Sequence, residues 1–383
     1  MRVFHCDHCG NPVFFENVVC GKCKHQLAFL PDVKIVASLD RGEKSQKAEE
    51  SSIWSSPAPS AAGKKYRLCK NYIDHNVCNW AIPAEDSNPY CPSCRLTTVI
   101  PDLSVDKNHD LWFRLETAKR RLIYSLIEFG LPLLSKKDDA VMGLDFHFLG
   151  DPVGGPRVLT GHDNGLITVN IDEADDVVRE ERRVSMHEPY RTLLGHFRHE
   201  IGHYYWDVLI KDSPEIDAFR AMFGDERADY DLALKNHYTN GPRPDWQQDF
   251  VSEYASVHPW EDWAETWAHY LHMTDTLETA ARCGMSLHPD RKDEPSMEKQ
   301  PSKPAHEQRF DEIINNWLPL TYVLNSLNRG MGLPDAYPFV LLQPAIEKLR
   351  FVHETICRQS ECKPKSKAQN NPELVPLGAG STN

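Results

Sequence analysis

The stretch Gly195-His-Phe-Arg-His199-Glu200-Ile-Gly-His203-Tyr-Tyr-Trp206 contains the pattern His-Glu-x-x-His. Residues four apart lie on one face of a helix, so the imidazoles of His199 and His203 can bind the same metal ion. Zinc suits such a pair, and the Glu200 carboxylate between them can reach a water that the zinc activates. Since zinc lowers the pKa of that water to about 7, Glu200 could accept its proton as the water attacks a carbonyl. The pattern therefore predicts a hydrolytic zinc site with Glu200 as general base.

The setting of the pattern is apolar on both sides, through Leu193, Leu194, Phe197, Trp206, Leu209 and Ile210. This spacing predicts a buried helix over about 189–211. Gly202 costs such a helix about 1 kcal/mol relative to alanine, which indicates that another element packs closely there. His196 lies one turn before His199, and a packed, hydrogen-bonded histidine is favoured over a substrate contact.

A third zinc ligand is expected in His258-Pro-Trp-Glu261-Asp-Trp-Ala-Glu265-Thr-Trp-Ala-His269. Glu261 and Glu265 are four apart on one helical face among tryptophans, where carboxylates are costly unless paired or bound to a metal. One of them can bind zinc while the other accepts a hydrogen bond from a zinc-binding imidazole. Asp262 is an alternative oxygen ligand, although its side chain points about 100° away around the helix. His269 continues the same face, and a role beside the ligands and ordinary packing are equally compatible with it.

Eight of the eleven cysteines lie before residue 95, and they form two clusters. The first cluster contains two Cys-x2-Cys pairs, made by Cys6, Cys9, Cys20 and Cys23. Two such pairs are typical of a structural zinc site, whereas a redox site would need one pair in a βαβ setting. The sequence therefore predicts a structural zinc in this cluster.

The second cluster has only one regular pair, and its members are Cys69, Cys78, Cys91 and Cys94. His75 could replace one cysteine, but a surface histidine is the simpler interpretation, so a second structural four-cysteine zinc site is favoured. Segments this short cannot build a sufficient apolar core, so zinc would supply much of their folding free energy.

The chain of 383 residues divides by composition into segments. We predict zinc-binding modules at 1–38 and 66–100, a flexible linker at 39–65, a larger domain at 101–360 and a disordered tail at 361–383. Helical periodicity begins at Asp110 and recurs at about 172–184, 189–211, 226–238, 260–282, 307–328 and 338–357, while 144–149 and 165–171 read as strands. The predicted class is α+β: two small zinc-ribbon-like modules, then a mostly helical domain with a small sheet.

Composition excludes several classes of protein. The formal net charge is −13, and the hydrophobic and charged fractions, 40% and 26%, are those of a globular chain. A strongly basic nucleic-acid binder is therefore excluded, although the nearly neutral first hundred residues leave the question open there. No apolar stretch approaches the roughly 20 residues that span a bilayer, and residues 1–6 contain no signal core, so we expect a cytoplasmic protein without a membrane partner.

The pattern at 199–203 together with the downstream Glu-x-x-x-Glu resembles the glutamate-type zincins, especially those of the anthrax lethal factor kind. The resemblance implies a zincin-like fold with Glu261, the first glutamate, as the third ligand. It also implies a transition-state-stabilising tyrosine seven residues earlier, which is Tyr254 here, and a phenol donor suits a developing oxyanion. Glu265 would then orient a zinc-binding histidine.

Over nearly its whole length the chain resembles a bacterial family of zinc-binding metallopeptidases with an N-terminal zinc ribbon. The stretches that carry this resemblance are Cys91-Pro-Ser-Cys-Arg-Leu96, Leu159-Thr-Gly-His-Asp163, Tyr190-Arg-Thr-Leu-Leu-Gly-His-Phe-Arg-His-Glu200 and His258-Pro-Trp-Glu-Asp-Trp-Ala-Glu265. In zincins, a strand such as 166–171 is the sheet edge on which a peptide substrate pairs, whereas Asn-Gly before it also suits a plain β-turn.

The leading hypothesis is a zinc-dependent peptidase with one catalytic and two structural zinc ions, acting on a protein or peptide substrate. The alternative is a zinc-ribbon adaptor that binds protein or nucleic acid, with a non-catalytic peptidase-like domain. A degenerate domain of that kind would be expected to lack Glu200 or a ligand, which weakens the alternative. A third possibility is a peptidase that its ribbons deliver to one partner.

Overall fold

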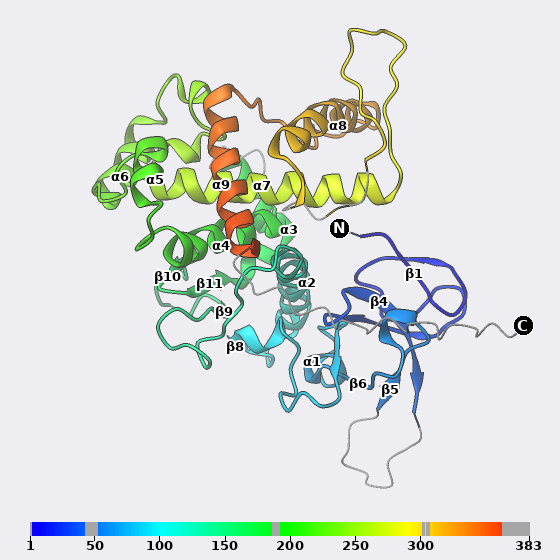
Figure 1. The fold of residues 1–383 in the computed structure, drawn as a ribbon. Helices are drawn as coiled ribbons and strands as arrows, with labels where there is room; N and C mark the ends of the chain where they lie inside the picture. The colour runs from blue at the N-terminus through cyan, green and yellow to red at the C-terminus, as the bar shows by residue number, and fades with distance from the viewer. Residues whose placement is uncertain are drawn as a thin grey trace, which may run out of the picture.

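The structure is a computed structural model that describes residues 2–42, 53–152, 154–185, 192–300, 303 and 307–361. Its N-terminal part is built from strands, and the rest is mostly helical with a small sheet (Figure 1). The predicted α+β class is therefore confirmed. The predicted tail, apart from its first residue, lies outside the described residues. Within the described part of the chain, no helix is long and apolar enough to cross a membrane.

The N-terminal part contains a two-stranded and a five-stranded antiparallel sheet. Strands β1 (Phe4–His5) and β2 (Pro12–Val13) form the small sheet. The larger sheet has the order β3 (Gln26–Leu30), β4 (Ile35–Arg41), β5 (Trp54–Ser55), β6 (Tyr66–Leu68) and β7 (Ala81–Pro83). A parallel bridge between Phe29 and Trp80 also joins β3 to the residue before β7. The five-stranded sheet thus joins the segment that follows the first cysteine cluster to the segment that holds the second.

The linker predicted at 39–65 is described only in part, because residues 43–52 lie outside the described residues. At its two described ends the chain belongs to the sheet: β4 runs to Arg41, and Trp54 in β5 pairs with Tyr66. Tyr66 is completely buried, and the 3-10 turn η1 (Pro59–Ala61) buries Ala61. These few apolar residues are enough to fix the ends of a mostly polar stretch onto the sheet.

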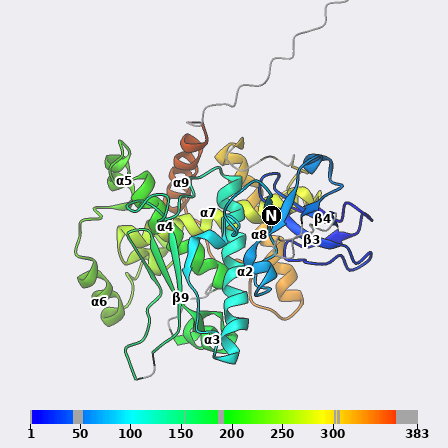
Figure 2. The same cartoon turned by 90° about the horizontal axis from the view of Figure 1, so that it is seen from below.

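Helix α2 (Asp106–Glu128) joins the N-terminal part to the rest of the molecule. Figure 2 shows α2 between the strands β3 and β4 on one side and β9 on the other. The ring of Tyr124 on this helix packs against Phe15 and Phe29, with centroids 5.5 and 5.8 Å apart. Arg2 donates a hydrogen bond of 2.8 Å to Glu128. One continuous apolar core therefore runs from the N-terminal sheets into the helical domain.

The second sheet has four strands in the order β10 (Gly161–Asp163), β11 (Leu166–Asn170), β9 (Asp145–Leu149) and β8 (Thr97–Val99). The strand β9 is parallel to both its neighbours, whereas β10 is antiparallel to β11 and lies at the edge. Phe146 and Phe148 on β9 pack on Phe197, with ring centroids 5.8 and 6.1 Å away. This contact seats helix α4 (Leu193–Leu209) on the sheet.

The long helix α7 (Pro259–Arg282) crosses the helical domain, with α4 packed against it and α9 (Gln343–Glu361) running across it (Figure 1). A Cβ at Gly202 of α4 would lie 2.9 Å from Cα of Ala264 and 3.2 Å from Cβ of Trp267, both on α7. The expected close packing at Gly202 is therefore confirmed: glycine lets α4 and α7 approach.

The other helices complete the fold, and the bounds of α3, α6 and α8 lie within a few residues of the predicted ones, whereas we predicted neither α1 nor α5. They are α1 (Lys70–Ile73), α3 (Asp176–Ser185), α5 (Ile216–Phe223), α6 (Tyr230–Asn240) and α8 (Phe310–Gly330). Helix α6 has no buried residue, and His237 near its end lies beside Tyr254, with ring centroids 6.1 Å apart.

Candidate metal centre and active site

Helices α4 and α7 bring together the imidazoles of His199 and His203 and the carboxylate of Glu261, residues far apart in sequence. The two Nε2 atoms are 3.2 Å apart. Oε2 of Glu261 lies 3.0 Å from Nε2 of His199 and 3.5 Å from Nε2 of His203. Three potential ligand atoms from two helices thus converge on one point.

The start of each helix is fixed by a side-chain cap. The Thr192 hydroxyl accepts a 2.9 Å hydrogen bond from the amide of Gly195, which starts α4 seven residues before His199. The imidazole of His258 accepts a hydrogen bond from Trp260, and Pro259 occupies the first turn of α7. Proline is favoured there because its missing N–H would have no partner in the helix. Glu261 therefore leaves the first turn of α7 toward α4.

These distances fit zinc. Ligand atoms placed tetrahedrally at the usual zinc distances are about 3.3 Å apart, close to the three separations seen here. Oε2 of Glu261 is buried and accepts no hydrogen bond from the described residues. A buried carboxylate oxygen without a donor is costly, and a cation would satisfy it. The residues present therefore fit a zinc ion.

Charge in the cluster also favours a cation. Burial opposes the ionised carboxylate of Glu261, but the nearby imidazoles of His203 and His199 outweigh it and hold its pKa well below the usual range. Burial likewise opposes a charged His199, yet Glu261 and Glu265 together raise the pKa of this imidazole well above its ordinary value. The carboxylates that favour a proton on His199 would equally favour a metal ion there.

Two further residues hold the candidate ligands in place. Nδ1–H of His199 donates to Oε1 of Glu265 at 2.7 Å, which leaves Nε2 free to face the cluster. The other oxygen of Glu265 accepts a 2.6 Å hydrogen bond from the Ser252 hydroxyl. Oε1 of Glu261 accepts a 2.7 Å hydrogen bond from the hydroxyl of Tyr230, the first residue of α6. We did not predict Tyr230 from the sequence, since no motif or periodicity marks it.

A pocket of about 320 Å³ opens beside this cluster, and Glu200 and Tyr254 line it together with the three candidate ligands. Burial raises the pKa of Glu200, although the two histidines oppose this effect. Tyr254 lies in the 3-10 turn η5 (Tyr254–Ser256), and its ring centroid is 5.8 Å from that of His199. Burial raises the pKa of Tyr254 well above its ordinary value, so its hydroxyl keeps the proton it could donate.

Residues 160–164, in and beside β10, also line the pocket, and His162 is one of them. The imidazole of His162 lies nearly parallel to that of His203, with centroids 6.3 Å apart. Burial, together with the nearby His203, lowers the pKa of His162 to about 3. Trp260 and Asp207 also line this pocket, and neither was singled out from the sequence, although Asp207 follows His203 by one helical turn.

The alternatives weighed from the sequence lie elsewhere. Asp262 is completely buried and accepts a 2.6 Å hydrogen bond from Lys348 of α9, so it faces away from the cluster. His196 lies 3.4 Å from the carboxylate of Glu173 and does not line the pocket. Nδ1 of His269 lies 2.6 Å from the hydroxyl of Tyr337, so this side chain belongs to the packing between α7 and the segment after α8.

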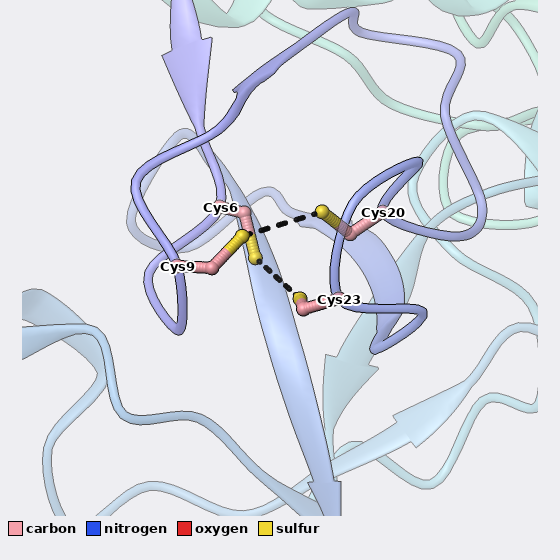
Figure 3. Close-up of side chains that lie close together, drawn as sticks. All are labelled: Cys6, Cys9, Cys20 and Cys23. Carbon is pink, nitrogen blue, oxygen red and sulfur yellow. Dashed lines mark hydrogen bonds between the residues drawn. The ribbon is translucent and has the colours of Figure 1, made fainter.

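Each cysteine cluster gathers its four thiols within 4.8 Å of one another. In the first cluster, Cys6 approaches Cys23 and Cys9 approaches Cys20, both at 3.6 Å between sulfurs (Figure 3). In the second cluster, Cys78 and Cys91 are 3.8 Å apart. Sulfurs around a tetrahedral zinc are about 3.8 Å apart, so both clusters fit this ion.

His75 does not belong to the second cluster. Its ring packs against Trp112 with centroids 5.2 Å apart, and its backbone carbonyl lies 2.7 Å from Nε2 of His109. The four-cysteine set is thus the one that the structure brings together.

Comparison with known proteins assigns two families along the chain. Residues 3–105 match a zinc-ribbon domain that spans both cysteine clusters, and residues 108–355 match the model of a metallopeptidase family. Uncharacterized proteins of Mycobacterium tuberculosis and Mycobacterium bovis are 43% identical to this chain over 357 residues, which is 93% of this chain and 95% of theirs. No solved structure matches. With zinc thus supported by the family and by both cysteine clusters, the chain belongs to the family described as "Putative zinc-binding metallo-peptidase" and carries an N-terminal zinc ribbon.

Proposed function

We propose that the protein is a zinc-dependent peptidase that hydrolyses peptide bonds at the pocket between α4, α7 and the hairpin of β10 and β11. His199, His203 and Glu261 would hold the zinc, as in the glutamate-type zincins that the sequence resembles. The observation that carries the proposal is the buried Oε2 of Glu261, which has no hydrogen-bond donor among the described residues and faces two imidazole nitrogens at 3.0 and 3.5 Å.

Bound zinc supplies a Lewis acid that makes water nucleophilic near neutral pH and polarises the substrate carbonyl. Glu200 then takes the proton from the attacking water at its carboxylate oxygen as the water adds to the carbonyl carbon. The same carboxyl group gives that proton to the departing amine nitrogen, so Glu200 ends the reaction as it began. The raised pKa of this buried carboxyl group suits an acid and base that must exchange one proton.

The other residues prepare these steps. Glu265 accepts the Nδ1 proton of His199 and so fixes the tautomer whose Nε2 is a ligand. Tyr254 keeps its proton and lies beside His199, where its hydroxyl would donate a hydrogen bond to the oxyanion that forms. The resemblance to the lethal factor kind of zincin, with its tyrosine seven residues before the third ligand, supports the same role.

The cysteine clusters would hold two structural zinc ions, which gives three zinc ions per chain. Closed four-thiolate sites have no open position for a substrate, so these ions would stabilise the fold. The substrate is proposed to be a protein or peptide, bound in the pocket rather than on the zinc ribbon.

The experiment is cleavage of casein and of a mixed peptide library by the zinc-loaded wild type and by Glu200→Gln, with zinc content measured for both. We expect the variant to lose cleavage and to keep three zinc ions. Glu180→Gln is the matched control, because Glu180 is an exposed helical residue paired with Arg183. This variant should cleave as the wild type does. Cleavage that survives in Glu200→Gln would contradict the proposal.

A further inference from the structure

The hairpin of β10 and β11 is closed by the two-residue turn Asn164-Gly165, since Asp163 pairs with Leu166. Both turn residues have positive φ, 47° and 82°, and a Cβ at residue 165 would lie 2.3 Å from the carbonyl oxygen of Gly143. Glycine is therefore required at 165, and the turn is rigid. His162 is held next to this turn.

A backbone hydrogen bond fixes the tautomer of His162. The amide of Gly165 donates to Nε2 of His162 at 2.9 Å, so this nitrogen must be the unprotonated acceptor. In a neutral imidazole the proton then lies on Nδ1. The hairpin thus orients the ring and leaves Nδ1–H as its one donor.

That donor is available to a ligand. The His162 side chain is 7% exposed, and this residue lines the pocket. Nδ1 of His162 makes no hydrogen bond to the described residues. It is also not among the fully buried side-chain atoms without a partner, so solvent or a ligand can reach it. His203 lines the same pocket, and its ring is nearly parallel to that of His162.

His162 and Tyr254 lie beside different candidate ligands of the metal centre. Tyr254 packs beside His199, whereas His162 packs beside His203. An extended peptide that places its scissile carbonyl near Tyr254 would pass a neighbouring carbonyl along the His162 side of the pocket. Backbone carbonyl oxygens are the acceptors that every peptide offers, whatever its side chains.

We propose that Nδ1–H of His162 donates a hydrogen bond to a backbone carbonyl oxygen of the peptide next to the scissile bond. This inference rests on the proposed function for the identity of the ligand, a peptide. His162 would then be a substrate-binding residue, and it would position the chain without contacting the reacting carbonyl.

The test separates the two nitrogens of His162. The amide of glutamine reaches the place of Nε2, so His162→Gln keeps an acceptor for Gly165 but loses the Nδ1 donor. The amide of asparagine occupies the place of Nδ1, so His162→Asn keeps a donor toward the pocket but loses the bond to Gly165. We expect His162→Asn to lose more thermal stability, and His162→Gln to lose more affinity for peptides.

The probes are a Leu-Leu hydroxamate, which offers peptide carbonyls, and acetohydroxamate, which offers none; both bind a zinc centre without turnover. In zinc-loaded protein, His162→Gln should lower the affinity for the dipeptide hydroxamate about three- to tenfold, which is the contribution of one hydrogen bond. The affinity for acetohydroxamate should stay unchanged. Equal affinity of wild type and His162→Gln for the dipeptide hydroxamate would overturn the proposal. So would equal losses for both hydroxamates that follow the loss of thermal stability, because these would indicate a purely structural histidine.

Peptide cleavage by the wild type is measured alongside. One outcome is that the wild type cleaves no peptide while His162→Gln still lowers the affinity for the dipeptide hydroxamate but not for acetohydroxamate. In that case the proposed function fails, and the role of His162 in peptide binding stands. If peptides are cleaved with unchanged kcat/KM by His162→Gln, the peptidase stands and the inference about His162 fails.

Discussion

The hydroxyl of Tyr230 donates a 2.7 Å hydrogen bond to Oε1 of Glu261, while Oε2 of the same carboxylate faces His199 and His203 at 3.0 and 3.5 Å. The two oxygens of Glu261 therefore have different surroundings: one is held by a phenol and the other is left for a cation. Because Tyr230 begins α6, the orientation of this carboxylate depends on where that helix starts.

Tyr230→Phe should weaken zinc binding at the catalytic centre, because the carboxylate loses the donor that fixes its orientation. Removing a hydrogen-bond partner of a metal ligand typically lowers metal affinity about 10–100-fold. Competition with a chelator measures the zinc affinity. Tyr205→Phe is the control, since the hydroxyl of Tyr205 donates to the backbone carbonyl of Pro132 at 2.9 Å and touches no candidate ligand. Equal zinc affinity in Tyr230→Phe and Tyr205→Phe would contradict the role given to Tyr230.

Glu261→Ala and Asp262→Ala should fail in different ways. Glu261→Ala is expected to lose one of three zinc ions in metal analysis. Asp262→Ala is expected to keep all three and to lose about 3 kcal/mol of unfolding free energy in urea, because Lys348 would remain buried without its carboxylate. This loss of unfolding free energy should be at the low end of the range for broken buried ion pairs. The reason is that Lys348 also donates to the backbone carbonyl of Asp249 and lies over the ring of Phe250. If Asp262→Ala loses the zinc and Glu261→Ala retains it, the ligand assignment is wrong.

Gly202→Ala tests the contact between α4 and α7. Alanine is the better helix former by about 1 kcal/mol, yet its Cβ would lie 2.9 Å from Cα of Ala264. We expect a net loss of about 1–3 kcal/mol in unfolding free energy, together with weaker zinc binding, because the two helices that carry the ligands must separate. In Gly330→Ala nothing lies within 4 Å of the added methyl, so this control should not lose stability. A more stable Gly202→Ala with normal zinc affinity would refute the close contact.

The three zinc ions should leave at different rates in excess chelator. The catalytic centre should empty first, because it opens into the pocket and its histidines are 13% and 14% exposed. The first cysteine cluster should follow, since Cys9 and Cys23 are partly exposed, and the second should empty last, since all four of its cysteines are buried.

The absorbance of a zinc-binding dye should rise in three phases, one for each zinc ion released. His203→Ala should remove the first phase, and Cys9→Ser should remove the second. Cys283→Ser is the control, because Cys283 is exposed and belongs to neither cluster. A fast phase that persists in His203→Ala would show that the ion released first is bound elsewhere.

The sequence predicted those features that short spacing determines. The i, i+4 histidines, the paired glutamates of α7 and the four-residue cysteine pairs each bring their members together within one or two turns of chain. Gly202 was informative for the same reason, since glycine inside an apolar helix has a local cost that only a close neighbour explains. The α+β class followed from periodicity.

Contacts made only in three dimensions could not be predicted from one sequence. Tyr230 meets Glu261 across 31 positions of chain, and Lys348 meets Asp262 across 86. The sheet contact that links the two cysteine clusters depends on β3 reaching the residue before β7, although each segment alone resembles a small module. Helix α5 has eight residues, which is too short for a clear period.

The most direct test of the account is a crystal structure of the zinc-loaded protein with anomalous scattering measured at the zinc edge. We expect a peak about 2.0–2.2 Å from Nε2 of His199, Nε2 of His203 and Oε2 of Glu261, and one peak in each four-cysteine cluster. A zinc-free cluster on α4 and α7, or a zinc bound there without Glu261, would contradict it.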